Sequence, residues 1–220
     1  MRHTEILMIF FALAFFFGSC GMNKGGKQLE FEEQEFENPY RDSTIYGLCG
    51  EGSAMNTLQI ITDNGDTLVL STLKAREKNS VFGNYAMGDR MAVVANVDST
   101  EALIVINLST LMGKWVMPNP IDGSDETGFT LFDGGIAESV QMTFATYTAW
   151  RILNGMLELT TIDEGGGDIE ENNTFRIVSL TPDSLTLTDE EEFYEYARKL
   201  PEVEYSDIEL EESAFEDFKM

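Results

Sequence analysis

Histidine is almost absent from this chain of 220 residues: His3 is the single example. It falls within an amino-terminal segment that has the features of a cleaved signal peptide, so we expect the mature protein to have no imidazole. Imidazole is the commonest general base in enzymes and the commonest ligand of transition metals. Its absence excludes serine–histidine and cysteine–histidine nucleophile pairs, and zinc or iron sites built on histidine. Carboxylates remain, but no spacing singles out a catalytic pair, so we expect no enzyme, no metal site and no cofactor.

Basic residues are scarce. Lysine and arginine number 14 against 39 aspartates and glutamates, which gives a formal net charge of −25. Nucleic-acid binding depends on cationic side chains that neutralise phosphates, so we expect no nucleic-acid partner. Anionic lipid headgroups are repelled for the same reason. Contact with a membrane would therefore need an anchor rather than electrostatic attraction.

The first apolar run, residues 6–17, has 12 residues. A membrane-spanning helix needs about 20 apolar residues, whereas the core of a signal peptide needs about 7 to 15. Residues 17–20, Phe-Gly-Ser-Cys, resemble the lipobox of bacterial lipoproteins. The resemblance implies a signal peptide over residues 1–19, acyl chains on Cys20 and the membrane as a partner. The alternative is an ordinary secretory signal followed by a chance cysteine. With Cys20 acylated, Cys49 has no disulfide partner, and we interpret it as a small buried residue.

Residues 20–43 mix glycine with charged residues, which indicates a tether between anchor and folded body. From residue 44 to 108, short alternating runs are separated by turn residues such as Asp63-Asn64-Gly65-Asp66, a hairpin signal. This spacing predicts a small β-barrel of OB or SH3 type. Three basic residues lie between its strands: Lys74, Arg76 and Lys78. We interpret them as an exposed charged turn; a binding loop is the alternative.

Residues 109–189 contain further short alternating runs, with hairpin signals at Asp133-Gly134 and Asn154-Gly155. Consecutive strands joined by tight turns predict an up-and-down antiparallel barrel, because closure removes exposed edges. Gly113-Lys114-Trp115 resembles the GxW signature of lipocalins. The order of segments resembles the small lipocalin-like domains of Bacteroidetes lipoproteins. That resemblance implies an all-β protein, with Trp115 closing one end of the second barrel.

Aromatic and large apolar residues of this second module are candidates for a ligand-binding lining. They are Trp115, Phe129, Leu131, Tyr147 and Trp150. Such side chains would suit a small hydrophobic or amphipathic ligand. The alternative is that they fill the barrel as core, since small barrels usually pack their interior with side chains.

Residues 190–220 form an acidic tail. Asp189 as amino-terminal cap, with Arg198 and Lys199 in the last turn and Pro201 as a stop, predicts a helix up to Leu200. In residues 201–220, Ile208, Phe215 and Phe218 recur at helical spacing between acids. Residues 201–220 either lie against the body, stay disordered or bind an envelope protein partner.

Together these features predict a non-catalytic lipoprotein of the bacterial cell envelope that binds a small apolar or amphipathic ligand. The alternative is a scaffold or interaction subunit that uses the acidic tail. The anchor predicts the outer membrane. The residues after Cys20, GMNKGGK, lack an acidic export cluster and favour a periplasm-facing site over the cell surface.

Overall fold

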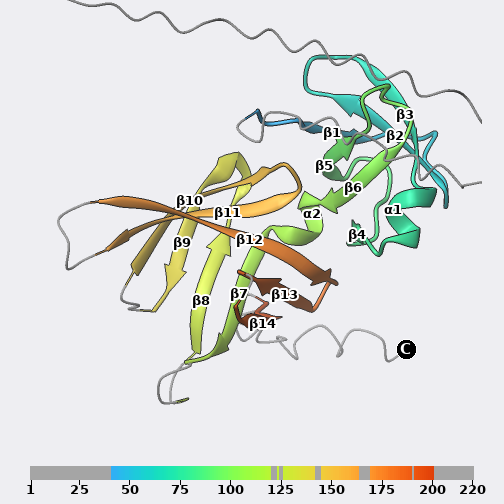
Figure 1. Ribbon diagram of the computed structural model, residues 1–220. Helices are drawn as coiled ribbons and strands as arrows, with labels where there is room; N and C mark the ends of the chain where they lie inside the picture. Colours follow the sequence, from blue (N-terminus) through green and yellow to red (C-terminus); the bar gives the residue numbers. More distant parts are fainter. Residues whose placement is uncertain are drawn as a thin grey trace, which may run out of the picture. The chain divides into compact units, whose positions relative to one another are not determined.

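Short strands with alternating buried and exposed side chains build two β-sheets in the computed structural model of this chain (Figure 1). The structure describes residues 41–119, 123, 126–141, 145–163, 169–189 and 191–200. The predicted signal peptide, Cys20, nearly all of the tether and residues 201–220 lie outside the described residues. Both sheets belong to the same compact unit.

The first sheet has the strand order β3-β2-β1-β5-β6-β4. Its elements are β1 (Thr44–Cys49), β2 (Thr57–Thr62), β3 (Thr67–Ser71), α1 (Leu73–Glu77), β4 (Val81–Phe82), β5 (Arg90–Ala95) and β6 (Ala102–Asn107). All pairs are antiparallel except β4–β6, and β3 meets the start of β6 at a parallel bridge between Ser71 and Glu101. The predicted barrel is thus a curled six-stranded sheet, with Cys49 buried in its core as expected.

After α2 (Leu108–Leu111), an eight-stranded sheet follows in the order β10-β11-β12-β13-β14-β7-β8-β9. Its strands are β7 (Gly113–Pro118), β8 (Glu126–Leu131), β9 (Ala137–Val140), β10 (Ala145–Leu153), β11 (Met156–Asp163), β12 (Glu170–Leu180), β13 (Ser184–Thr188) and β14 (Phe193–Arg198). The outer strands β9 and β10 meet through the bridge Ile136–Ala149 and a 2.8 Å bond from the Tyr147 backbone N–H to Ser139 Oγ. The all-β class and the nearly closed up-and-down barrel are confirmed.

Two local expectations in this barrel are wrong. The connection after β8 is not a two-residue turn at Asp133-Gly134 but a wider one with a 3₁₀ turn over Asp133–Gly135. The helix predicted from Asp189 to Leu200 is instead β14, which pairs with β13 and β7. Without β14 both neighbours would present unpaired edges, and this cost outweighs the local helix signals. Asp189 instead caps the turn that precedes β14. Its carboxylate accepts from the backbone N–H groups of Glu191 (3.1 Å) and Glu192 (3.0 Å).

One hydrophobic core connects the two sheets. Ala92 and Ile106 of the first sheet belong to the same buried cluster as Trp115 of the barrel. The Tyr46 hydroxyl donates to the Ile152 carbonyl at 2.6 Å, and the Gly83 N–H donates to the Leu180 carbonyl at 3.2 Å. These contacts fix the first sheet against the β10–β11 end of the barrel and the end of β12.

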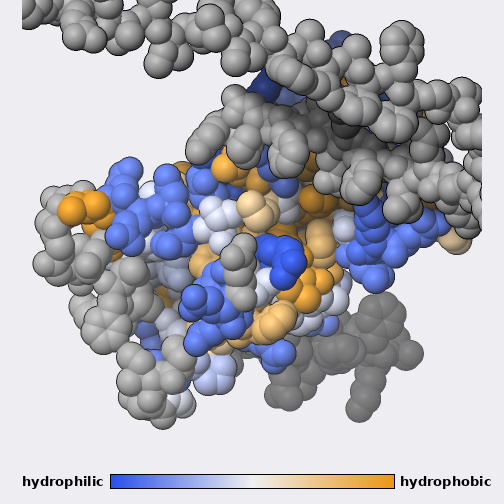
Figure 2. Space-filling view, viewed as in Figure 1, coloured by the Kyte–Doolittle hydropathy of each residue, from blue (hydrophilic) through white to orange (hydrophobic). Residues whose placement is uncertain are grey.

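Where Figure 2 colours the described residues, hydrophilic and hydrophobic areas lie interleaved on the visible face. Across the residues that the structure describes, none of the helices combines the length and apolarity needed to cross a membrane.

Candidate functional site

The barrel interior holds the residues predicted to line a ligand site. Trp115, Phe129 and Leu131 are fully buried in the core cluster. The ring of Phe129 lies 5.4 Å from that of Tyr147 and 4.9 Å from that of Tyr196, centroid to centroid. Aromatic rings at these distances and tilts pack favourably against one another. Trp115, Phe129 and Leu131 therefore fill the barrel as core side chains.

Trp115 lies at the end of the barrel where β7 begins. Its indole N–H donates to the Leu111 carbonyl at 2.7 Å, and the Arg198 guanidinium covers its ring. Arg198 also donates to the carbonyls of Met112 (2.8 Å), Thr110 and Pro182. Burial lowers the pKa of Arg198. Trp115 and Arg198 together seal this end against water.

The opposite end is where the connections after β7, β9, β11 and β13 leave the barrel, because every pair is antiparallel. Tyr147 and Tyr194 lie near the starts of their strands at this end. The Tyr194 hydroxyl donates to Asp189 Oδ2 at 2.7 Å. Tyr196 is 7% exposed, and among the described residues its hydroxyl has no hydrogen-bond partner. Burial raises the pKa of Tyr147 and Tyr196.

A cavity of about 390 Å³ lies between the first sheet and the sealed end of the barrel. We call it the inter-sheet pocket. The first sheet contributes Tyr46, Asp63 and Arg90, and the remaining lining residues are Leu108, Met112, Asp133, Gly134, Gly135, Trp150 and Arg151. Of the five residues predicted to line a ligand site, Trp150 is the one that borders this pocket.

One wall of the inter-sheet pocket carries a bidentate ion pair. Both terminal nitrogens of the Arg90 guanidinium donate to the two carboxylate oxygens of Asp63. This pairing lowers the pKa of Asp63 and raises the pKa of Arg90. The Arg90 guanidinium lies 6.0 Å from the centre of the Tyr46 ring. Burial raises the pKa of Tyr46, so its hydroxyl stays protonated at neutral pH.

The other wall is mainly apolar. Leu108 and Met112 lie beside Trp150, whose indole N–H donates to the Phe132 carbonyl at 2.8 Å. Arg151 at the rim donates to Glu158 Oε1 at 2.7 Å. Both guanidinium groups of the pocket are thus neutralised by carboxylates. An apolar wall that faces paired charges suits a neutral molecule with one apolar face and one hydrogen-bonding face.

Sequence reasoning missed Tyr46, Asp63 and Arg90. Asp63 was visible as a hairpin-turn residue, and its role as an ion-pair partner depends on how β1, β2 and β5 align. Within the described ranges there is no group of three or more histidine, cysteine or acidic residues placed to hold a metal ion.

Comparison with known proteins bears on the barrel. Residues 107–199 match the family model described as lipocalin-like. This stretch is a lipocalin-like domain. The matched range of the lipocalin-like domain runs from the end of β6 through β14. It includes the Trp115 and Arg198 pair and most of the inter-sheet pocket's apolar wall.

The chain is also similar to a solved structure, a lipocalin-like protein from Bacteroides thetaiotaomicron, with 34% sequence identity. The match covers 41% of this chain and 97% of that chain, with a TM-score of 0.37. The search of curated proteins found no match.

Proposed function

We propose that this protein binds a small, neutral, amphipathic molecule in the inter-sheet pocket, and does so as a non-catalytic lipoprotein of the cell envelope. The observation that carries the proposal is the cavity of about 390 Å³ between Trp150 and the Arg90–Asp63 pair. Small-molecule sites are typically clefts of about 300 to 1,000 Å³ with mostly apolar walls and a few convergent polar groups.

The location differs from the inside of the barrel, where the resemblance to lipocalins directed attention. Trp115, Phe129 and Leu131 pack into the core there. The inter-sheet pocket uses the sealed end of the lipocalin-like domain as one wall and the first sheet as the other. The first sheet thus supplies the Arg90–Asp63 pair, and the lipocalin-like domain contributes Asp133 and Arg151 beside its apolar side chains.

Ligand chemistry follows from the paired charges. An anionic ligand would have to compete with Asp63 for Arg90, whose bidentate bonds to Asp63 are of the strong, charge-assisted kind. A neutral ligand leaves the pair intact. It accepts from guanidinium N–H groups, donates to carboxylate oxygens and lays an apolar face on Trp150, Leu108 and Met112.

Binding can be tested with N-phenyl-1-naphthylamine, a neutral amphipathic dye whose fluorescence rises in an apolar site. We expect the double variant Asp63→Asn with Arg90→Gln to weaken dye binding about tenfold, since it replaces the ion pair by neutral amides without a change in net charge. The control pair Lys78→Gln with Glu138→Gln also conserves net charge and lies on exposed positions outside the pocket. It should leave the affinity unchanged.

A second variant separates this pocket from the barrel interior. Tyr147→Ala changes the end of the barrel opposite to Trp115 and lies outside the inter-sheet pocket. If Tyr147→Ala weakens dye binding and the Asp63/Arg90 pair of substitutions does not, the molecule binds inside the barrel and the inter-sheet assignment is wrong. Native mass spectrometry of protein isolated gently from its host should then identify the natural ligand.

The anchored, envelope-located part of the proposal rests on the lipobox resemblance at residues 17–20. Acyl chains contribute about 0.8 kcal/mol per buried methylene, so several chains on Cys20 give durable attachment. We expect Cys20→Ser to move the protein from the membrane to the soluble fraction, and mass spectrometry to find acyl groups on Cys20 of the unaltered protein. An unmodified cysteine in membrane-free protein would refute the anchor while leaving the pocket untouched.

A further inference from the structure

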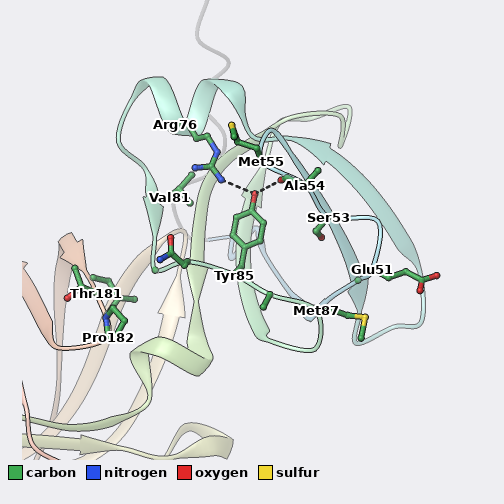
Figure 3. Close-up of a pocket in the computed structure, with 15 residues that line it drawn as sticks. Glu51, Ser53, Ala54, Met55, Arg76, Val81, Tyr85, Met87, Thr181 and Pro182 are labelled. Atoms are coloured by element: carbon green, nitrogen blue, oxygen red, sulfur yellow. Dashed lines mark hydrogen bonds between the residues drawn. The ribbon is translucent and has the colours of Figure 1, made fainter.

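Two cavities adjoin beside β4 and share three lining residues: Arg76, Val81 and Leu180. The larger, of about 430 Å³, also borders the β1–β2 connection, the β4–β5 connection and the β12–β13 turn (Figure 3). The smaller, of about 300 Å³, lies between the end of α1, β4 and the last residues of β12. We call the two cavities together the β4 groove. It shares no lining residue with the inter-sheet pocket.

The Arg76 side chain is held in place where the two cavities adjoin. Its Nη2 donates to the Tyr85 hydroxyl at 3.2 Å, and that hydroxyl donates to the Ala54 carbonyl at 3.2 Å. A guanidinium carries five N–H donors, and the bond to Tyr85 uses one. The other donors make no hydrogen bond or ion pair with a described residue. Figure 3 shows the guanidinium between the Tyr85 hydroxyl and Val81, so these donors are open to a ligand in the groove.

The basic cluster at residues 74–78 is thus divided. Lys74 pairs with Glu101 at 2.7 Å, as an exposed charged turn would. Lys78 is exposed and lines neither cavity of the groove. Arg76 alone of the three basic residues lines both cavities. For Arg76, the alternative of a binding loop is the one that the structure favours.

The charges that line the groove favour an anion with a single charge. Among the described residues that line it, Arg76 is the one cation and Glu51 the one acid. Glu51 lies beyond Tyr85 as seen from Val81, and its carboxylate is directed away from Tyr85 (Figure 3). The chain's net charge of −25 repels a doubly charged ligand more than a singly charged one. A carboxylate carries one charge, whereas a phosphate group carries about 1.5 to 2 at pH 7.

Apolar side chains line the smaller cavity together with Arg76. They are Val81, Phe82, Val178 and Leu180. Val178 is 42% exposed, and Val81 and Phe82 are half-buried, so part of this apolar surface faces water. Covering such surface with the apolar part of a ligand is favourable by about 25 cal/mol for each Å² removed from water. The groove therefore offers a cation and an apolar surface within one cavity.

We propose that the β4 groove binds a small monocarboxylate with an apolar body, an aromatic or medium-chain acid. The ligand carboxylate accepts from the open N–H donors of Arg76, and its apolar body lies on Val81 and Val178. Tyr85 is a positioning residue, because its hydroxyl holds the guanidinium in place without touching the ligand. This site is independent of the inter-sheet pocket, and its ligand differs from the neutral one proposed there by carrying a negative charge.

Calorimetric titration of the full chain with three acids and their primary amides tests the proposal. The acids are hexanoate, 4-phenylbutyrate and indole-3-acetate. Each amide keeps the apolar body and removes the charge. In at least one pair we expect the acid to bind about tenfold more tightly than its amide, the size of one charge-assisted contact. No binding of any acid at millimolar concentration, or equal Kd values within every pair, would overturn the proposal.

Matched variants assign the carboxylate contact. Arg76→Gln should remove the advantage of the acid and leave the affinity for the amide unchanged. Arg76→Lys should retain part of the advantage, because an ammonium group keeps the charge but lacks the planar fork. Tyr85→Phe should reduce the advantage about threefold, since the guanidinium loses the hydroxyl that holds it. Lys78→Gln makes the same charge change as Arg76→Gln outside the groove. An equal loss in Lys78→Gln would show that net charge, and not Arg76, selects the acid.

Two further variants locate the ligand. Val178→Ser should weaken binding of the acid and of the amide alike, and unchanged affinities would refute the placement of the apolar body. The double variant of Asp63 and Arg90 should leave the advantage of the acid intact. If the advantage disappears in that double variant and survives in Arg76→Gln, the acid binds at Arg90 in the inter-sheet pocket and the assignment to the β4 groove is wrong.

Discussion

The guanidinium carbon of Arg198 lies 4.2 Å above the centre of the Trp115 ring. Arg198 comes from the last strand of the barrel along the chain and Trp115 from the first, and these strands, β14 and β7, are paired neighbours in the sheet. Arg198 also donates to carbonyls of Thr110 and Met112, at the end of α2, where helical carbonyls lack partners. One side chain thus ties β14 to β7 and caps the helix that leads into the barrel.

Arg198→Ala should destabilise the protein by about 2 to 3 kcal/mol, because several carbonyls lose a charged donor and the Trp115 ring loses its cover. Arg198→Lys keeps the charge but not the planar fork, so it should recover less than half of the loss. Urea denaturation followed by tryptophan fluorescence measures both. Arg176→Ala on the exposed face of β12 is the control and should change stability by no more than about 0.5 kcal/mol. Equal effects of Arg198→Ala and Arg176→Ala would contradict this role.

Gly128 permits the close approach of β8 to β7. Its φ is +152°, and a Cβ there would lie 2.0 Å from the Trp115 carbonyl oxygen. Gly128→Ala should therefore cost about 3 kcal/mol or more, since backbone has to move. Gly65 is the control, because its φ is +89° and an added Cβ would meet open space. A substitution there measures the cost of the backbone conformation without a steric clash. Gly65→Ala should cost about 1 kcal/mol. Chemical denaturation of the two variants side by side gives the comparison, and a smaller loss for Gly128→Ala would count against the steric account.

Stability should respond to acid through the Asp63–Arg90 pair. The bond from Arg90 holds the pKa of Asp63 below its usual value. A depressed pKa contributes stability that is fully present above the unfolded value, near 3.9, and is lost as pH falls through the folded value. Asp63 is largely exposed, so solvent screening limits the contribution to at most about 1 kcal/mol.

Asp63→Asn should consequently be less stable than the unaltered protein at pH 7, and the difference should shrink as pH falls below about 3.9. Urea midpoints measured across this range test the prediction. Added salt at 1 M should reduce the difference at pH 7, because it screens exposed charges. A difference that persists undiminished at pH 2.5 would mean that Asp63 acts through packing rather than charge.

Alkaline titration should reveal the contact between Tyr194 and Asp189. The Asp189 carboxylate accepts the hydroxyl hydrogen bond and raises the pKa of Tyr194 to about 12. A raised tyrosine pKa contributes stability that is present below pH 10 and is lost as pH rises from 10 to about 12. Asp189→Asn should move the ionisation of Tyr194 to lower pH. Absorbance at 295 nm measures the phenolate, and the Tyr194→Phe variant shows which part of the titration belongs to Tyr194. Identical titration curves for the unaltered protein and Asp189→Asn would disprove the contact.

Features fixed by neighbouring residues could be read from the sequence. Asn154-Gly155 predicted a two-residue hairpin, and both residues have positive φ between the paired residues Leu153 and Met156. The meander and the barrel followed from such turns and from alternation along the strands. The family resemblance at Gly113-Lys114-Trp115 pointed to the correct domain.

Features set by pairing between residues far apart in the chain could not be read from the sequence. Residues 189–200 carry the sequence signals of helix caps. The strand that forms there depends on partners far back in the chain, such as Val116, which pairs with Ala197. The inter-sheet pocket needs Asp63 and Arg90 to meet across two sheet registers and then face Trp150. No local sequence pattern indicates that these three residues lie close together. Trp150 was selected because it is aromatic, and its position next to the cavity followed from how the sheets pack.

The shared core of Ile106, Leu108 and Trp115 affects how this protein can be cut or recombined. A fragment that begins at β7 would leave the apolar surface beneath the first sheet facing water, and Tyr46 would no longer bond to Ile152. Whoever transplants the lipocalin-like domain into another chain must carry the preceding strands along or redesign that surface. In this chain the two sheets have to be engineered as one piece.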